Sequence, residues 1–176
     1  MKKILLFVIC AVMAVSFTGC YGSGGTSLEA VQTSAAPDAT TINTDDYEDN
    51  LEGLEKYFIA LGYIPEKAQP TEMMYNVIGA IDGDRYNFAV DSSAVYVELY
   101  EYDPDNLNDE ATRVINEVKK DGKFYVFADD GNGNVAYEAT LSDNEKYLMI
   151  YTDSSSEEAN VQRKTDVINA LKSFHK

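Results

Sequence analysis

The stretch RYNFAVDSSAVYVELYEY, residues 85–102, decides the fold class of this 176-residue chain. Apolar side chains alternate with others on both sides of residues 91–93. Successive side chains of a β-strand point to opposite faces, so this alternation predicts two strands. The segment Asp91-Ser92-Ser93 is typical of a hairpin turn. The apolar positions are Tyr86, Phe88 and Val90 in the first half and Val95, Val97 and Leu99 in the second.

Segments with helical periodicity lie before and after this hairpin. Apolar residues recur every three or four positions in residues 51–61, 71–81, 107–118 and 157–174, so four helices are expected. The third ends at Lys119, Lys120 and Gly122, which is typical of a helix C-terminus. The fourth is expected to turn Val161 inward, with Ser155 and Glu158 forming a capping box at its start. Its other inward residues are Ile168, Leu171 and Phe174.

Three more segments, 123–128, 135–141 and 146–152, alternate as strands do. The expected order is therefore helix, helix, two strands, helix, three strands, helix (ααββαβββα). Hairpins dominate this order, so it predicts an α+β domain. We expect a largely antiparallel sheet of about five strands, with amphipathic helices packed on one face. The domain should span residues 47–176.

The N-terminus has the layout of an export signal. Lys2 and Lys3 precede an apolar run from Ile4 to Val15, and small residues follow it. The next residues, Phe17-Thr18-Gly19-Cys20, resemble the lipobox of bacterial lipoproteins, although the usual leucine is replaced by Phe17. This resemblance covers the first 20 residues. It implies that a specialised peptidase removes residues 1–19 and that Cys20 carries diacylglycerol and further acyl chains such as palmitate.

Two alternatives compete with lipidation of Cys20. One is a conventional signal peptidase site, but no A-x-A-like tripeptide stands at a suitable distance. The other is an uncleaved anchor, but the apolar run of about 14 residues is shorter than the 20 or so that span a bilayer as a helix. The lipoprotein interpretation predicts an extracytoplasmic protein of the cell envelope whose first partner is the lipid bilayer. Residues 20–46, rich in Gly, Ser, Thr and Asp, are expected to form a disordered tether.

Composition excludes several function classes. The net charge of −16 argues against nucleic acid as a partner, because binding to phosphates requires clustered Lys and Arg. The cysteines, Cys10 and Cys20, both lie near the N-terminus, so no disulfide framework is expected in the domain. The one histidine, His175, is penultimate and is expected to be solvated. Catalytic pairs of Ser or Cys with His are therefore not expected, and no cofactor is predicted.

Metal sites are also not predicted. Asp130, Asn132 and Asn134 have the spacing of a calcium loop, but Val135 and Leu141 occupy the positions that need Gly and Glu. A hairpin turn is the expected role of this segment. The acidic residues Asp103, Asp105 and Asp109 are expected to serve a turn and the start of a helix.

Tyrosines supply the candidate binding residues. Strand periodicity suggests that they lie on one sheet face, opposite the aliphatic residues. If exposed, this face would bind an envelope protein or peptide, since tyrosine is favoured at interfaces. If covered, it would be a second layer of core. The residues concerned are Tyr96, Tyr100, Tyr125, Tyr147 and Tyr151.

Two function classes follow from these observations. The first is a membrane-anchored, non-catalytic binding or adaptor domain. The second is a small envelope hydrolase with a site made only of carboxylates, for which Glu98 or Glu101 would act as acid or base. Because the sequence offers few residues that could act as catalytic groups, the first class is favoured.

Overall fold

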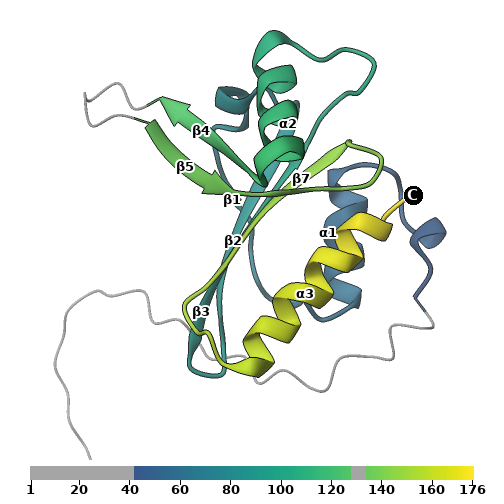
Figure 1. The fold of residues 1–176 in the computed structure, drawn as a ribbon. Helices are drawn as coiled ribbons and strands as arrows, with labels where there is room; N and C mark the ends of the chain where they lie inside the picture. Colours follow the sequence, from purple (N-terminus) through teal and green to yellow (C-terminus); the bar gives the residue numbers. More distant parts are fainter. Residues whose placement is uncertain (1–41, 128–133) are drawn as a thin grey trace, which may run out of the picture.

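A computed structural model describes residues 42–127 and 134–176, and shows three helices around a twisted antiparallel sheet (Figure 1). The expected α+β class is confirmed. Two short 3-10 helices, η2 (Thr44–Asp46) and η3 (Tyr75–Ile78), accompany the main elements. In chain order these are α1 (Leu51–Ala60), β1 (Thr71–Glu72), β2 (Asp82–Val90), β3 (Ser93–Glu101), α2 (Asp109–Asp121), β4 (Lys123–Phe127), β5 (Asn134–Glu138), β6 (Thr140–Leu141), β7 (Tyr147–Asp153) and α3 (Glu158–Ser173).

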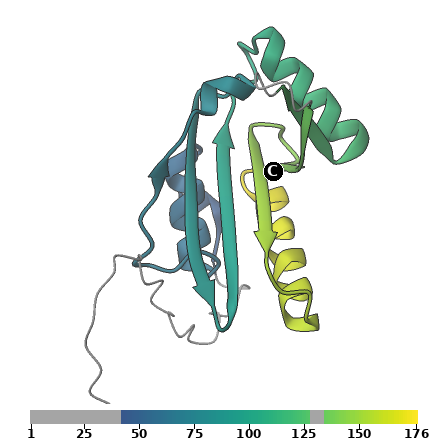
Figure 2. The ribbon, with the colours of Figure 1, turned by 90° about the vertical axis from the view of Figure 1, so that its left-hand side faces the viewer.

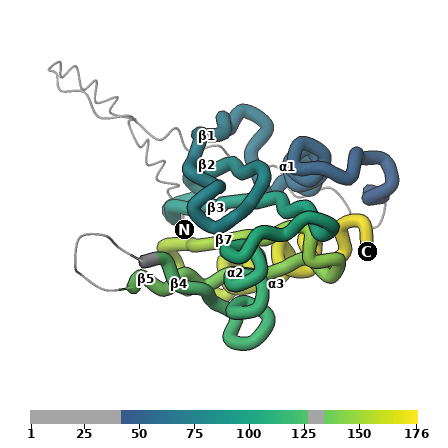
Figure 3. Tube along the Cα trace, turned by 90° about the horizontal axis from the view of Figure 1, so that it is seen from above, coloured from purple at the N-terminus to yellow at the C-terminus, as the bar shows by residue number. Residues whose placement is uncertain are grey.

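The predicted hairpin is the centre of the sheet. Strands β2 and β3 pair along their full length, with Val90 opposite Ser93 across a two-residue turn. The turn needs a left-handed residue, which Asp91 supplies with a φ of 51°. Strand β7 pairs antiparallel with the other edge of β3, which gives the order β1-β2-β3-β7-β6. Figure 3 shows β1, β2, β3 and β7 side by side.

The expected antiparallel sheet of five strands is confirmed, but β4 and β5 are not among its strands. These two strands form a separate two-stranded ribbon. The chain passes from this ribbon into the main sheet at Ala139, between β5 and β6, so that β5 pairs with β4 while β6 pairs with β7. Figure 1 shows the ribbon diverging from β7 beyond this point.

Helices cover both faces of the sheet, so the expectation of helices on one face is also wrong. Helices α1 and α3 pack against one face, and α2 packs against the other (Figures 1 and 2). The reason is that β3 and β7 carry apolar residues at both parities. Leu99 and Met149 belong to the core under α1 and α3, whereas Tyr100 and Ile150 belong to the core under α2.

Helix α1 forms as its periodicity predicts. Asn50 caps it, since the Asn50 Oδ1 accepts a hydrogen bond from the Gly53 N–H at 2.8 Å. Its apolar stripe is buried against the sheet. Ile42, N-terminal to the expected domain boundary at residue 47, also packs against this core. The stripe consists of Leu51, Leu54, Phe58 and Leu61.

The helix expected over residues 71–81 does not form. Thr71–Glu72 pairs with β2 as an edge strand, and helical structure is limited to the single turn η3. Gly79, with a φ of 75°, ends this turn in the left-handed region, and its carbonyl accepts a hydrogen bond from Asn108. Tertiary pairing therefore overrides the local period. Met74 and Val77 remain exposed as a result, at 79% and 45%.

The other two helices agree with expectation in most respects. Helix α2 ends at Gly122 in the left-handed conformation, as predicted. The N-cap of helix α3 is Glu157, which makes no side-chain cap bond, and the Ser155 Oγ accepts from the Glu157 N–H, so the capping box of Ser155 and Glu158 is not formed. Val161, expected to be inward, is 55% exposed.

Candidate functional site

A groove lies on the face of the sheet that α2 covers, beside the β4–β5 ribbon. Its volume is about 180 Å³. An engineered apolar cavity of about 150 Å³ accepts benzene, so this space suits one ring-sized apolar group. We define the groove by its lining residues, which are Met73, Met74, Val77, Ile78, Arg85, Glu98, Tyr100, Phe124, Val126, Tyr137 and Ile150.

Three parts of the chain build this groove. The floor comes from β2, β3 and β7, where the register places Arg85 opposite Glu98. One wall is η3 with the residues before it, including the exposed Met74. The other wall is the ribbon, on which the rings of Phe124 and Tyr137 stack with centroids 5.6 Å apart. Because the walls are apolar and partly exposed, the groove favours an apolar occupant.

The polar residues of the floor are bonded to one another. The Arg85 Nε donates to the Glu98 Oε1 at 2.7 Å, and the Tyr100 hydroxyl donates to the Glu98 Oε2 at 2.8 Å. Burial, followed by the charge of Glu98, raises the pKa of Tyr100 above its ordinary value, so its hydroxyl remains a donor. Glu98 thus carries a donor on each oxygen. This arrangement orients a strip of polar groups and offers no free general base.

The predicted tyrosine face is wrong as a single surface. Tyr100 lines the groove and Tyr96, on the same side of β3, is 44% exposed. Tyr125 is half-buried on β4, outside the main sheet. Tyr147 and Tyr151 are buried on the opposite face.

The cause of this error is the register of β7. Tyr151 pairs with Val97, so it shares the face that α1 and α3 cover. Strand β7 reads Tyr-Leu-Met-Ile-Tyr from residue 147, and both parities are apolar. Alternation alone therefore does not indicate which set faces which helix.

Several groove residues were not among the sequence candidates. Met74 and Val77 belong to the stripe of the helix that does not form. Phe124 and Tyr137 come together through the register of β4 and β5. One sequence signal could have identified such residues: segments that do not form a long helix, such as 71–81, still carry more apolar side chains than a single helical turn can bury.

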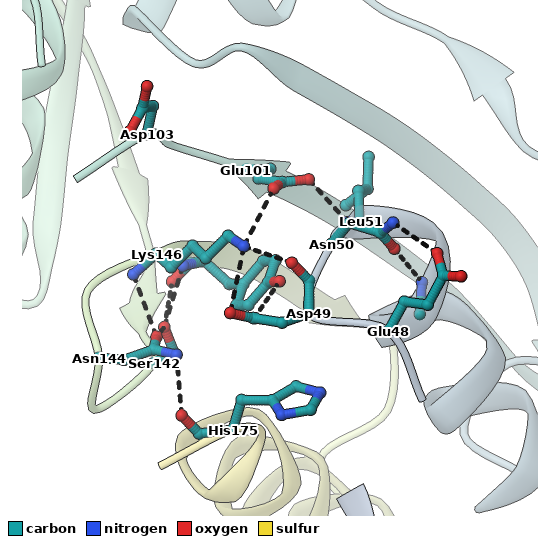
Figure 4. Close-up of polar contacts among 12 residues, drawn as sticks. Glu48, Asp49, Asn50, Leu51, Glu101, Asp103, Ser142, Asn144, Lys146 and His175 are labelled. Atoms are coloured by element: carbon teal, nitrogen blue, oxygen red, sulfur yellow. Dashed lines mark hydrogen bonds and ion pairs between the residues drawn. The ribbon is translucent and has the colours of Figure 1, made fainter. Parts of the chain in front are cut away.

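A second set of polar contacts surrounds the start of α1 (Figure 4). The Lys146 Nζ lies 3.3 Å from the Asp49 Oδ2 and 3.4 Å from the Glu101 Oε1, and it also donates to the Asp49 carbonyl. The Tyr147 hydroxyl donates to the Asp49 Oδ1 at 2.7 Å. The Glu101 Oε2 accepts a hydrogen bond from the Leu51 N–H at 2.7 Å. These bonds hold the residues before α1 against the sheet.

The carboxylates suggested for acid–base chemistry do not face each other. Glu101 is buried, with 8% of its surface exposed, and its two carboxylate oxygens contact Lys146 and the Leu51 N–H. Glu98 points to the opposite face of β3, in the groove. His175 is not a solvated tail residue, because its Nε2 lies 3.0 Å from the Tyr47 carbonyl oxygen and its ring contacts Phe174.

A carboxyl pair joins α1 to β2. Glu55 faces Asp84, and its buried Oε1 has no hydrogen-bond partner among the described residues. Burial and then the Asp84 charge raise the pKa of Glu55 from 4.5 to about 8. The Tyr86 hydroxyl acts in the opposite direction, since it donates to the charged carboxylate. Glu55 is therefore protonated at neutral pH.

Within residues 42–127 and 134–176, no group of three His, Cys, Asp or Glu side chains is placed to hold a metal ion. Asp103 serves a turn, since its Oδ1 accepts a hydrogen bond from the Asp105 N–H at 3.1 Å. Asp130, Asn132 and the lipidation candidate Cys20 lie outside the described residues.

No helix in the described part of the chain combines the length and apolar character that crossing a bilayer requires. Comparison of the whole chain with protein-family models, with curated proteins and with solved structures finds no match.

Proposed function

We propose that this chain is a bacterial lipoprotein, anchored outside the cytoplasm through an acylated Cys20, whose domain is a non-catalytic binding or adaptor module. The observation that carries the binding function is the groove. It presents exposed apolar side chains around a strip of bonded polar groups. Its chemistry suits recognition of an apolar side chain from an envelope protein or peptide.

The anchor supports this role. The N-terminal layout resembles that of lipoproteins, and several acyl chains on one cysteine give a stable attachment, at about 0.8 kcal/mol per buried methylene. The tether would leave the domain free to meet partners near the membrane surface. The acidic charge opposes binding to anionic lipid headgroups, so the groove is assigned to protein and not to lipid.

Lipidation is tested by Cys20→Ser in the full chain. The variant should lose incorporation of labelled palmitate and move from the membrane pellet to the soluble fraction, because the acceptor thiol is gone. Labelling and fractionation of cells check this result. Equal membrane association and unchanged apparent mass in the variant would contradict the anchor.

Binding at the groove is tested by photocrosslinking in intact cells, with benzoylphenylalanine in place of the exposed Met74. A specific adduct is expected, and Val77→Glu should remove at least about nine-tenths of it, since a charge in an apolar contact costs more than 1.4 kcal/mol. Val161→Glu is the matched control, because Val161 is similarly exposed but lies on α3. Absence of an adduct, or equal loss in both variants, would rule out the groove as the binding site.

A further inference from the structure

The two edges of the β4–β5 ribbon differ in how their backbone groups are satisfied. On β4, the Tyr125 N–H donates to the Glu117 Oε2 at 3.1 Å, and the Tyr125 carbonyl accepts from the Arg113 Nη2 at 3.0 Å. Tyr125 therefore points its backbone groups away from β5 and toward α2. In an antiparallel pair, the residue opposite such a position also turns its groups outward. That residue is Ala136.

The same alternation makes three residues of β5 face outward at its other edge. They are Asn134, Ala136 and Glu138, opposite residues 127, 125 and 123 of β4. All three are exposed, and within the described residues β5 pairs with no strand except β4. Helix α2 covers the β4 edge. At the other edge, the Lys164 Nζ of α3 lies 3.7 Å from the Glu138 Oε2, and among the described residues no strand pairs with Asn134 or Ala136 on this side. An edge of this kind presents N–H and C=O groups at the spacing of a strand.

This open edge is continuous with the groove. The register places Tyr137 opposite Phe124 and Val135 opposite Val126, on the face of the ribbon that forms the groove wall. Val135 and Tyr137 are 47% and 37% exposed. A strand added beside β5 would therefore place every second side chain on the groove side. The intervening side chains would lie on the face of Glu138, where polar residues are expected.

We propose that the groove's partner is an extended polypeptide segment of another protein that pairs antiparallel with Asn134, Ala136 and Glu138 and directs alternate apolar side chains toward the groove. This inference rests on the proposed binding function and names its partner class. Main-chain hydrogen bonds supply affinity and the groove supplies selectivity, as in other cases of strand addition. A second copy of this chain is disfavoured as the partner, because each copy carries a net charge of −16.

The probe is the peptide Ac-Lys-Leu-Thr-Leu-Thr-Leu-Lys-NH2, titrated into the full chain in lipid nanodiscs by calorimetry. With leucines on the groove side, antiparallel pairing points the threonine N–H groups at β5 and the leucine N–H groups away. N-methylation of the two threonines should weaken binding at least about tenfold, whereas N-methylation of two leucines should change it less than about twofold. Equal affinity of the two methylated peptides, or no binding of the parent peptide, would overturn strand addition.

The matched protein variants are Ala136→Pro and Ala136→Ser. Proline removes an N–H that faces away from β4, so the ribbon should survive, with a melting temperature close to that of the serine variant. Ala136→Pro should weaken the parent peptide at least about tenfold and Ala136→Ser less than about twofold. If Ala136→Pro binds the parent peptide normally while Val77→Glu does not, the groove is the binding site but strand addition is ruled out. Concentration-dependent dimerisation that Ala136→Pro abolishes would identify a second copy as the partner and overturn the proposal.

Discussion

Replacing Gly53 by alanine is expected to lower the free energy of unfolding by about 3 kcal/mol, the upper part of the range for overpacking. A Cβ at this position would lie 1.9 Å from the Glu48 carbonyl oxygen and 2.8 Å from its carbon. Both are backbone atoms, so no side-chain rotation relieves the contact. Helix propensity alone predicts the opposite sign, a gain of about 1 kcal/mol, because Gly53 lies inside α1.

The residues before α1 have little freedom to move away from such a Cβ. Asn50 is bonded at both ends of its side chain, with the Nδ2 donating to the Glu48 Oε2 at 3.0 Å and the Oδ1 accepting from the Gly53 N–H. Lys146, which directly precedes β7, contacts both the carboxylate and the backbone carbonyl of Asp49. A shift of Glu48 would break several of these contacts together.

Urea unfolding of the full chain measures this effect, with Gly62→Ala as the control. Gly62 has a φ of 73° but open space around its Cβ position, so alanine there should cost about 1 kcal/mol from backbone strain alone. We expect Gly53→Ala to cost at least twice as much. A stabilised Gly53→Ala variant would show that the segment before α1 does not pack as described.

The second large effect concerns Glu55, whose ionisation is expected to lower the stability of the domain as the pH rises from about 4.5 to about 8. Its folded pKa of about 8 exceeds its ordinary value of 4.5, so the folded state binds more protons between these values. The contribution of Glu55 to stability is therefore complete below about pH 4.5 and is lost as the pH rises through 8. Asp84 and Asp82 act in the same direction, because their charges oppose ionisation of Glu55.

Glu55→Gln should therefore stabilise the domain at pH 9 and change it little at pH 5. We expect a gain of about 1–2 kcal/mol at pH 9, reduced from the full shift because solvent screens a side chain that is only partly buried. Thermal or urea unfolding of both proteins at the two pH values measures this difference. Glu52→Gln is the control, since Glu52 is exposed on the same helix and its pKa is lowered by a hydrogen bond to Lys56. A gain at pH 9 in the control, or none in Glu55→Gln, would contradict the carboxyl pair.

Local pattern predicted some elements well and others poorly. The β2–β3 hairpin and the buried stripe of α1 follow from short-range alternation and period, and both form as expected. Residues 71–81 have a helical period, yet pairing of Thr71–Glu72 with β2 leaves only one turn of helix. Because the segment is not a helix, its apolar residues Met74 and Val77 line one wall of the groove. This part of the candidate site could therefore not be predicted from the periodicity of the sequence.

What the sequence determined by itself is the set of features that depend on near neighbours. Strand alternation, the position of the turn after Val90 and the α+β class are of this kind, because backbone geometry couples residues a few positions apart. The tertiary structure alone decided the face on which Tyr147 and Tyr151 lie, the departure of β5 from the sheet at Ala139, and the role of Gly53. These depend on register and contact between distant segments, such as Leu51 with Glu101 and Asp49 with Lys146, which no local period encodes.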